Sequence, residues 1–210
     1  MVNTSRLFIF LLCISVSFML ACSRDTPLRM DTYGNMPDFS LQDQGGYNFE
    51  KNDMIGKVAL VDFIYTNCTD SCSLLSSRMK DVQGSVEKKG LGSSQVILLS
   101  FSVDGMNDTP DVLMSYANRY NANNQRWKLL TGSSEIVVNV AKDLKLPFYN
   151  SMKETEHLHE DGYVHMHEYE IKHSGRILLI DKNGMVRRYY DPRDQWDIGN
   201  VIADVQYLLE

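Results

Sequence analysis

The fold of this 210-residue chain is decided by the stretch Val58-Ala-Leu-Val-Asp-Phe-Ile-Tyr-Thr-Asn-Cys68-Thr-Asp-Ser-Cys72. Residues 58–65 are mostly aliphatic or aromatic and rich in β-branched side chains, which predicts a buried strand. Two cysteines follow, and apolar residues then recur at helical spacing from about residue 71 to residue 89, before Gly90. Because residues four apart on a helix share a face, the sulfurs of Cys68 and Cys72 can converge on one ion or close a disulfide.

The rest of the chain repeats this alternation of strand and helix. Strands are predicted at residues 96–103 and 127–130, and a hairpin is predicted from 176–181 and 185–190 around Lys182-Asn183-Gly184. Helices are predicted at residues 109–120, 134–144 and 195–209. This order indicates an α/β domain with a central mixed sheet and helices on both faces. Several folds share the order, but the thioredoxin-like fold is the one that places a cysteine pair after the first core strand.

The N-terminus has the pattern of an export signal. Residues 7–21 are almost entirely apolar, and this run is shorter than the roughly 20 residues of a spanning helix. It ends in Met19-Leu20-Ala21-Cys22, which resembles the lipobox of bacterial lipoproteins. We therefore predict a lipoprotein signal peptide at 1–21, a lipid on Cys22 with a tether at 22–35, and one domain at 36–210. The alternative is a plain cleavage site or an uncleaved anchor, with Cys22 incidental.

These features predict an extracytoplasmic protein, lipid-anchored to a bacterial membrane, where disulfides can persist. The formal net charge of −6, without a cluster of Lys and Arg, argues against nucleic acid as a partner. A chain of this length can bury a core without disulfides, and the small loop of a Cys68–Cys72 bridge would remove little chain entropy. A purely structural disulfide is therefore the less favoured interpretation of the pair. The start of a helix is expected to stabilise thiolates, and two thiolates suit Cu(I), with imidazole as a third ligand.

All five histidines lie between His157 and His173. Four of them form two pairs, His157 with His159 and His165 with His167, and alternate residues of an extended segment point to the same side. A second metal site at these four histidines is one hypothesis. A solvated loop that happens to be rich in histidine is the other.

Further motifs resemble the Sco/SenC family of thioredoxin-fold copper proteins, which assist assembly of the binuclear copper centre of cytochrome c oxidase. They are Thr66-Asn67-Cys68-Thr69-Asp70-Ser71-Cys72, Ser102-Val103-Asp104 with Asp108-Thr109-Pro110, Trp127 with Leu130-Thr131-Gly132, and His173-Ser174 with Leu179-Ile180-Asp181. The resemblance covers about residues 36–210. It implies that Cys68 and Cys72 are the copper thiolates and a redox pair, and that His173 is the imidazole ligand. Gly105 stands where the family usually has proline, and Lys172 stands where it commonly has an acidic residue.

The resemblance implies a membrane-anchored copper chaperone or thiol–disulfide protein. Its expected partners are a copper-receiving oxidase subunit, a thiol–disulfide reductant and the membrane. The sequence does not separate copper delivery from reduction of the target's cysteines, so enzymatic activity is left open. The alternatives are a copper sensor or buffer, a general thiol–disulfide oxidoreductase and a thiol peroxidase. Against a general oxidoreductase, the spacing is CxxxC and no proline lies near residues 170–175; against a peroxidase, Thr66 precedes Cys68 by two residues rather than three.

Overall fold

The computed structural model describes residues 30–68, 72–151, 170–194 and 196–210. The chain divides into two compact units, Met1–Met30 and Asp31–Glu210. Of the first unit only Met30 is described, so the predicted signal peptide and Cys22 lie outside the described residues.

This unit is built on one eight-stranded mixed sheet with the order β1-β10-β9-β4-β5-β6-β2-β3. The strands are β1 (Gly34–Asn35), β2 (Ser40–Asp43), β3 (Asn48–Glu50), β4 (Val58–Ile64), β5 (Val96–Ser102), β6 (Trp127–Thr131), β9 (Ile177–Ile180) and β10 (Met185–Tyr190). Strands β4, β5 and β6 are parallel to one another, and the other neighbours are antiparallel. The predicted mixed sheet of an α/β fold is confirmed.

The core lies on both faces of the two central strands. Every residue of β4 and β5 is buried, as expected for parallel strands covered on both sides. Phe63 and Phe101 stack with ring centroids 5.4 Å apart, and Phe39 meets Phe101 edge-on at 5.0 Å. Fully burying one such side chain stabilises the fold by about 1.5–3 kcal/mol, so this pair of strands anchors the sheet.

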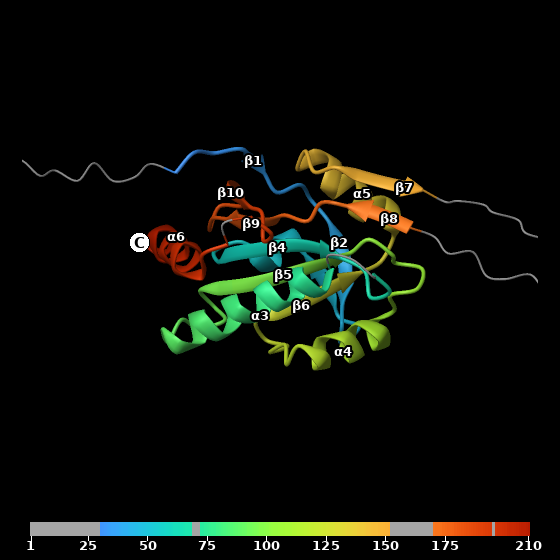
Figure 1. Ribbon diagram of the computed structural model, residues 1–210, viewed down its shortest axis with the longest axis horizontal. Helices are drawn as coiled ribbons and strands as arrows, with labels where there is room; N and C mark the ends of the chain where they lie inside the picture. Colours follow the sequence, from blue (N-terminus) through green and yellow to red (C-terminus); the bar gives the residue numbers. More distant parts are fainter. Residues whose placement is uncertain (1–29, 69–71, 152–169, 195) are drawn as a thin grey trace, which may run out of the picture. The chain divides into compact units, whose positions relative to one another are not determined.

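Helices cover both faces of the sheet (Figure 1). They are the one-turn α2 (Lys51–Met54), α3 (Cys72–Lys88), α4 (Pro110–Arg119), α5 (Ser134–Asp143) and α6 (Ile198–Leu209). The crossovers from β4 to β5 and from β5 to β6 run in the same direction along the sheet, which places α3 and α4 on one face. There Ser76 and Tyr116 share a buried hydrogen bond of 2.8 Å. Helix α6 packs beside α3, and α5 packs on the other side of β5. None of the helices in the described ranges is long and apolar enough to cross a bilayer.

The predicted elements are present within a few residues of their expected ends, whereas β1, β2, β3 and α2 were not predicted. Strands β1, β2 and β3 have two to four residues each, too few for a periodic pattern. The sheet begins at Gly34, two residues before the predicted start of the domain, because Gly34 pairs with Val186 of β10. A separate two-stranded sheet, β7 (Phe148–Ser151) with β8 (Glu170–His173), was also not predicted, since polar residues interrupt both strands.

Gly105 lies in the loop between β5 and α4 and is held against the loop that follows β6. A Cβ atom built on Gly105 would lie 1.8 Å from the carbonyl oxygen of Gly132. A side chain at this position would therefore require the backbone of one of the two loops to move. The contact fixes the loop that leads to Asp108.

We predict that Gly105→Ala destabilises the protein by about 1–3 kcal/mol, the usual cost of forcing extra atoms into a packed site. The matched control is Gly84→Ala inside α3, where an added Cβ meets nothing within 4 Å. That control should stabilise the protein by roughly 0.5–1 kcal/mol, because glycine weakens a helix interior. Urea unfolding followed by circular dichroism measures both changes. Equal effects of the two substitutions would contradict the packing argument.

Candidate metal centre

Three separate segments bring Cys68, Cys72 and His173 together. Cys68 ends a turn directly after β4, and its backbone N–H donates to the carbonyl oxygen of Tyr65 at 3.3 Å. Cys72 is the first residue of α3, and His173 is the last residue of β8. The placement of the cysteine pair at the junction of the core strand and the next helix is confirmed.

The ligand atoms of the three residues all lie within 4.8 Å of one another. Cys72 Sγ lies 3.3 Å from His173 Nε2, and His173 Nδ1 lies 3.1 Å from the carbonyl oxygen of Ser174. A carbonyl oxygen can only accept, so Nδ1 carries the proton and Nε2 presents its lone pair to the sulfur. The imidazole is therefore held in the tautomer that can bind an ion at Nε2.

The three side chains differ in their access to solvent. Cys72 is 1% exposed, whereas Cys68 and His173 are half-buried. The ring of Tyr65 meets the imidazole edge-on, with centroids 5.8 Å apart, and limits its rotation. Lys172 is exposed, and strand alternation directs it away from the face of β8 that His173 occupies. Its charge therefore lies on the solvent side and is weakened by water.

The two thiols are linked to each other. The hydrogen bond with Cys68 is the main cause that raises the pKa of Cys72, and burial raises it further. The sequence suggested the opposite direction, because the start of a helix favours thiolate. The thiol–thiol contact and the loss of solvent outweigh the helix dipole. A bound ion must therefore displace the proton that Cys72 holds.

Comparisons with known proteins identify the family. The SCO1/SenC family model matches residues 29–210. The chain belongs to the SCO1/SenC family. The SCO1 protein homolog of Bacillus subtilis (strain 168) is 31% identical over 170 residues, which are 80% of this chain and 79% of that protein.

Two solved structures of the same family share the fold. A SCO1/SenC family lipoprotein from Bacillus anthracis str. Ames is 28% identical with a TM-score of 0.70, over 89% of this chain and 99% of that one. The structure of BsSco, a member of the Sco family of cytochrome c oxidase assembly proteins in which a disulfide switch was identified, is 26% identical with a TM-score of 0.65, over 86% and 96% of the two chains. The resemblance seen in the motifs and the thioredoxin-like fold are both confirmed.

In this SCO1/SenC protein, one buried acid near the centre was not predicted as a site residue. Asp62 lies in β4, is fully buried, and accepts a hydrogen bond at Oδ1 from the Ser100 hydroxyl. Burial raises its pKa to about 7, while the Ser100 hydrogen bond acts in the opposite direction, as would a positive charge on the His173 ring. Its carboxylate charge also raises the pKa of Cys72. A single acidic residue inside an otherwise apolar strand was the available signal.

We predict that Asp62→Asn stabilises the protein strongly at pH 8 and only slightly at pH 4. The folded-state pKa of about 7 exceeds the usual value of 3.8, so the folded protein binds the extra proton and loses stability as the pH rises between these values. The loss amounts to at most roughly 4 kcal/mol, at 1.36 kcal/mol per pKa unit. Urea unfolding of both proteins at the two pH values gives the difference. A difference that does not change with pH would contradict the assignment.

The donor set fits copper better than a hard cation. Two sulfurs and one imidazole nitrogen are soft or intermediate donors, which select Cu(I) over ions that prefer oxygen. Among the described residues, this is the one group of three or more His, Cys, Asp or Glu side chains close enough to hold an ion. His157, His159, His165 and His167 lie outside the described residues, so the second metal site stays a prediction.

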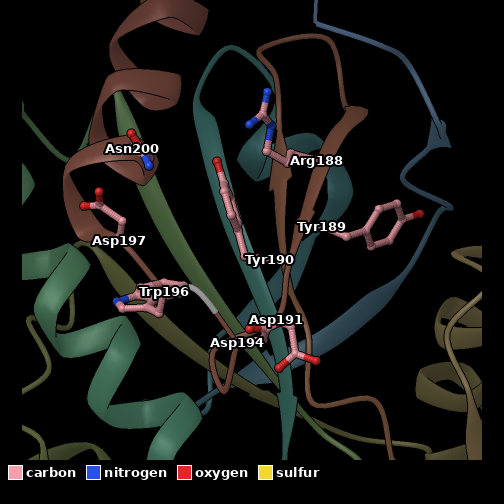
Figure 2. Close-up of a pocket in the computed structure, with 8 residues that line it drawn as sticks. All are labelled: Arg188, Tyr189, Tyr190, Asp191, Asp194, Trp196, Asp197 and Asn200. Carbon is pink, nitrogen blue, oxygen red and sulfur yellow. The ribbon is translucent and has the colours of Figure 1, made fainter.

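A pocket of about 250 Å³ lies elsewhere, between the end of β10 and the start of α6, and contains none of the three donors (Figure 2). Its charges are largely compensated within the protein. Arg188 forms an ion pair of 3.2 Å with Asp204, which also accepts the Tyr190 hydroxyl at 2.7 Å. Asp197 caps α6 by accepting from the Gly199 amide. These contacts account for Arg188, Tyr190 and Asp197 as parts of the fold.

Proposed function

We propose that this protein binds copper as cargo at Cys68, Cys72 and His173 and assists maturation of the copper centre of cytochrome c oxidase from an extracytoplasmic, membrane-anchored position. The observation that carries the proposal is the convergence of two sulfurs and one lone-pair nitrogen within 4.8 Å. Membership of the SCO1/SenC family, and the description of BsSco as belonging to cytochrome c oxidase assembly proteins, support the same function.

The exposure of the donors suits a cargo that must be passed on. Cys72 is buried and holds its place at the start of α3, whereas Cys68 and His173 face the surface. A ligand of the receiving protein can therefore approach from the side of Cys68 and His173 while Cys72 still holds the ion. Three donors also leave Cu(I) at low coordination, which it accepts with thiolates.

We expect the reduced protein to bind one Cu(I), and Cys68→Ser or Cys72→Ser to weaken binding by about 100-fold or more. Losing a direct ligand should cost at least as much as losing a partner behind a ligand, which is worth about 10–100-fold. His173→Ala should weaken binding less than the loss of either sulfur. Anaerobic titration against a chromophoric Cu(I) chelator measures the affinities, and Asp181→Asn, at the opposite edge of the sheet, is the control. Both serine variants binding as tightly as the unmodified protein would refute the proposed site.

A second candidate activity is reduction of the target's cysteines by the Cys68–Cys72 dithiol. The hydrogen bond between the two thiols favours it, because their sulfurs are already neighbours. One target disulfide would gain two electrons and two protons and open, while a Cys68–Cys72 disulfide forms. The variant His173→Ala separates the two activities, since copper binding uses the imidazole and disulfide exchange between thiols does not require it.

We further propose that Cys22 carries a lipid that holds the domain at a membrane surface, where its partners are the oxidase subunit and a thiol–disulfide reductant. The Leu20-Ala21-Cys22 junction after a short apolar run supports this. The family relationship to a Bacillus anthracis protein described as a lipoprotein supports it as well.

Expressed in bacteria, the unmodified protein should be cleaved before Cys22 and partition into the detergent phase. Cys22→Ala should remain an uncleaved precursor, because lipoprotein processing requires the modified cysteine. Cys13→Ala, inside the expected signal peptide, is the control and should behave like the unmodified protein. Phase separation and intact mass spectrometry give the result. Normal cleavage of Cys22→Ala to a protein in the aqueous phase would mean an ordinary signal peptide.

A further inference from the structure

A buried carboxyl in the loop before α4 is bonded to the turn that bears Cys68. Asp108 is fully buried, and its two oxygens accept hydrogen bonds from the backbone amide and the hydroxyl of Thr66 and from the hydroxyl of Ser102. Burial raises the pKa of Asp108, and the hydrogen bonds from Ser102 and Thr66 act against that shift. The carboxyl thus joins two loops that are 42 residues apart in the sequence.

Thr66 is the residue through which Asp108 reaches the cysteine. The turn from Tyr65 to Cys68 is closed by the Cys68 amide on the Tyr65 carbonyl, and Thr66 is the first central residue of that turn. Asp108 holds both polar groups that Thr66 offers as donors, the amide and the hydroxyl. Rotation of the turn would break these bonds and leave a buried carboxyl without its donors, which is costly.

Cys72 is held in a different way. It is 1% exposed and belongs to a regular helix that packs on β4 and β5. Both cysteines are thiols in this structure, and a disulfide requires the two sulfurs to approach to about 2.05 Å with a restricted torsion angle. Because Cys72 is fixed by the core, most of that approach falls to Cys68 and its turn.

We propose that Asp108 is a positioning residue which, through Thr66, holds Cys68 in the dithiol geometry and opposes closure of the Cys68–Cys72 disulfide. We call the contact of Asp108 with Thr66 the clamp. Its expected effect on copper affinity rests on the proposed function, whereas its expected effect on the thiol–disulfide equilibrium does not. The same clamp keeps the two sulfurs apart, as an ion bound between them requires.

The test is the equilibrium of the full chain, in detergent, with dithiothreitol. Oxidised dithiothreitol takes two electrons and two protons from the Cys68–Cys72 dithiol; its ring disulfide opens as the protein disulfide forms. Alkylation followed by mass spectrometry of tryptic peptide 58–78, which contains both cysteines, gives the ratio of the two forms without interference from Cys13 or Cys22.

Asp108→Asn should shift this equilibrium toward the disulfide by about tenfold, which is about 30 mV for a two-electron couple. Thr66→Val removes the hydroxyl at nearly constant volume and should shift it in the same direction by at least threefold. Thr66→Ser keeps the hydroxyl and should stay within twofold of the unmodified protein. The double variant Asp108→Asn/Thr66→Val should fall short of the product of the two single shifts, because both changes break the same contact.

Asp181→Asn is the matched control for a loss of stability. Asp181 is a buried carboxyl that accepts from the amides of Asn183 and Met185 and pairs with Arg187 in the hairpin turn between β9 and β10. This turn lies at the opposite edge of the sheet, so its loss should destabilise the protein and leave the equilibrium with dithiothreitol unchanged. Any one of three results would refute the proposed role of Asp108. These are an unchanged or oppositely shifted dithiothreitol equilibrium in Asp108→Asn, no shift in Thr66→Val, or a shift in Asp181→Asn equal to that in Asp108→Asn.

A Cu(I) titration of the reduced variants separates this inference from the proposed function. Asp108→Asn should bind Cu(I) about tenfold more weakly than the unmodified protein. If the unmodified protein binds no Cu(I), the proposed function fails, and the redox equilibrium still decides whether the clamp exists.

Discussion

The parallel pairing of β4 with β5 is the constraint on which the site depends. The register runs from Val58 opposite Val96 to Ile64 opposite Ser102, so both strands end at the same edge of the sheet. At that edge β4 leads into the turn with Cys68, and β5 leads into the loop with Asp108. A slip of one residue would turn Asp62 and its partner Ser100 to opposite faces and separate them. The hydrophobic burial that fixes this register therefore also fixes which polar groups meet at the edge.

The sequence was informative where a pattern is local and uninformative where a contact is remote. Strands β4 and β5 and helix α3 could be predicted because each has seven or more residues with a clear apolar pattern. Strands β7 and β8 mix polar and apolar residues without regular alternation, so no periodicity marks them. His173 could be assigned only through the family resemblance, because nothing within its own strand points to a cysteine 101 residues away. The contact of Asp108 with Thr66 had no sequence signal for the same reason.

The protonation of Cys72 shows how competing local effects are decided. A helix dipole is worth about 0.3–1 kcal/mol to a charge near its first turn. Burial and the hydrogen bond in which the Cys72 thiol donates to Cys68 each exceed that amount when the group is nearly inaccessible to water. Position at a helix start is therefore not sufficient to make a cysteine acidic. In this centre, an approaching soft ion must displace the proton of Cys72.

Because of the separate two-stranded sheet, the three candidate ligands come from two different sheets. Cys68 and Cys72 follow β4 of the large sheet, whereas His173 ends β8 of the small one. An ion bound to all three is a cross-link between the two sheets that exists only while the cargo is present. By linkage, uptake must strengthen the attachment of β8 and therefore increase hydrogen-exchange protection of its amides. If copper is the cargo, loosening of β8 at one end would remove one of its three ligands without any movement of the buried strands β4 and β5.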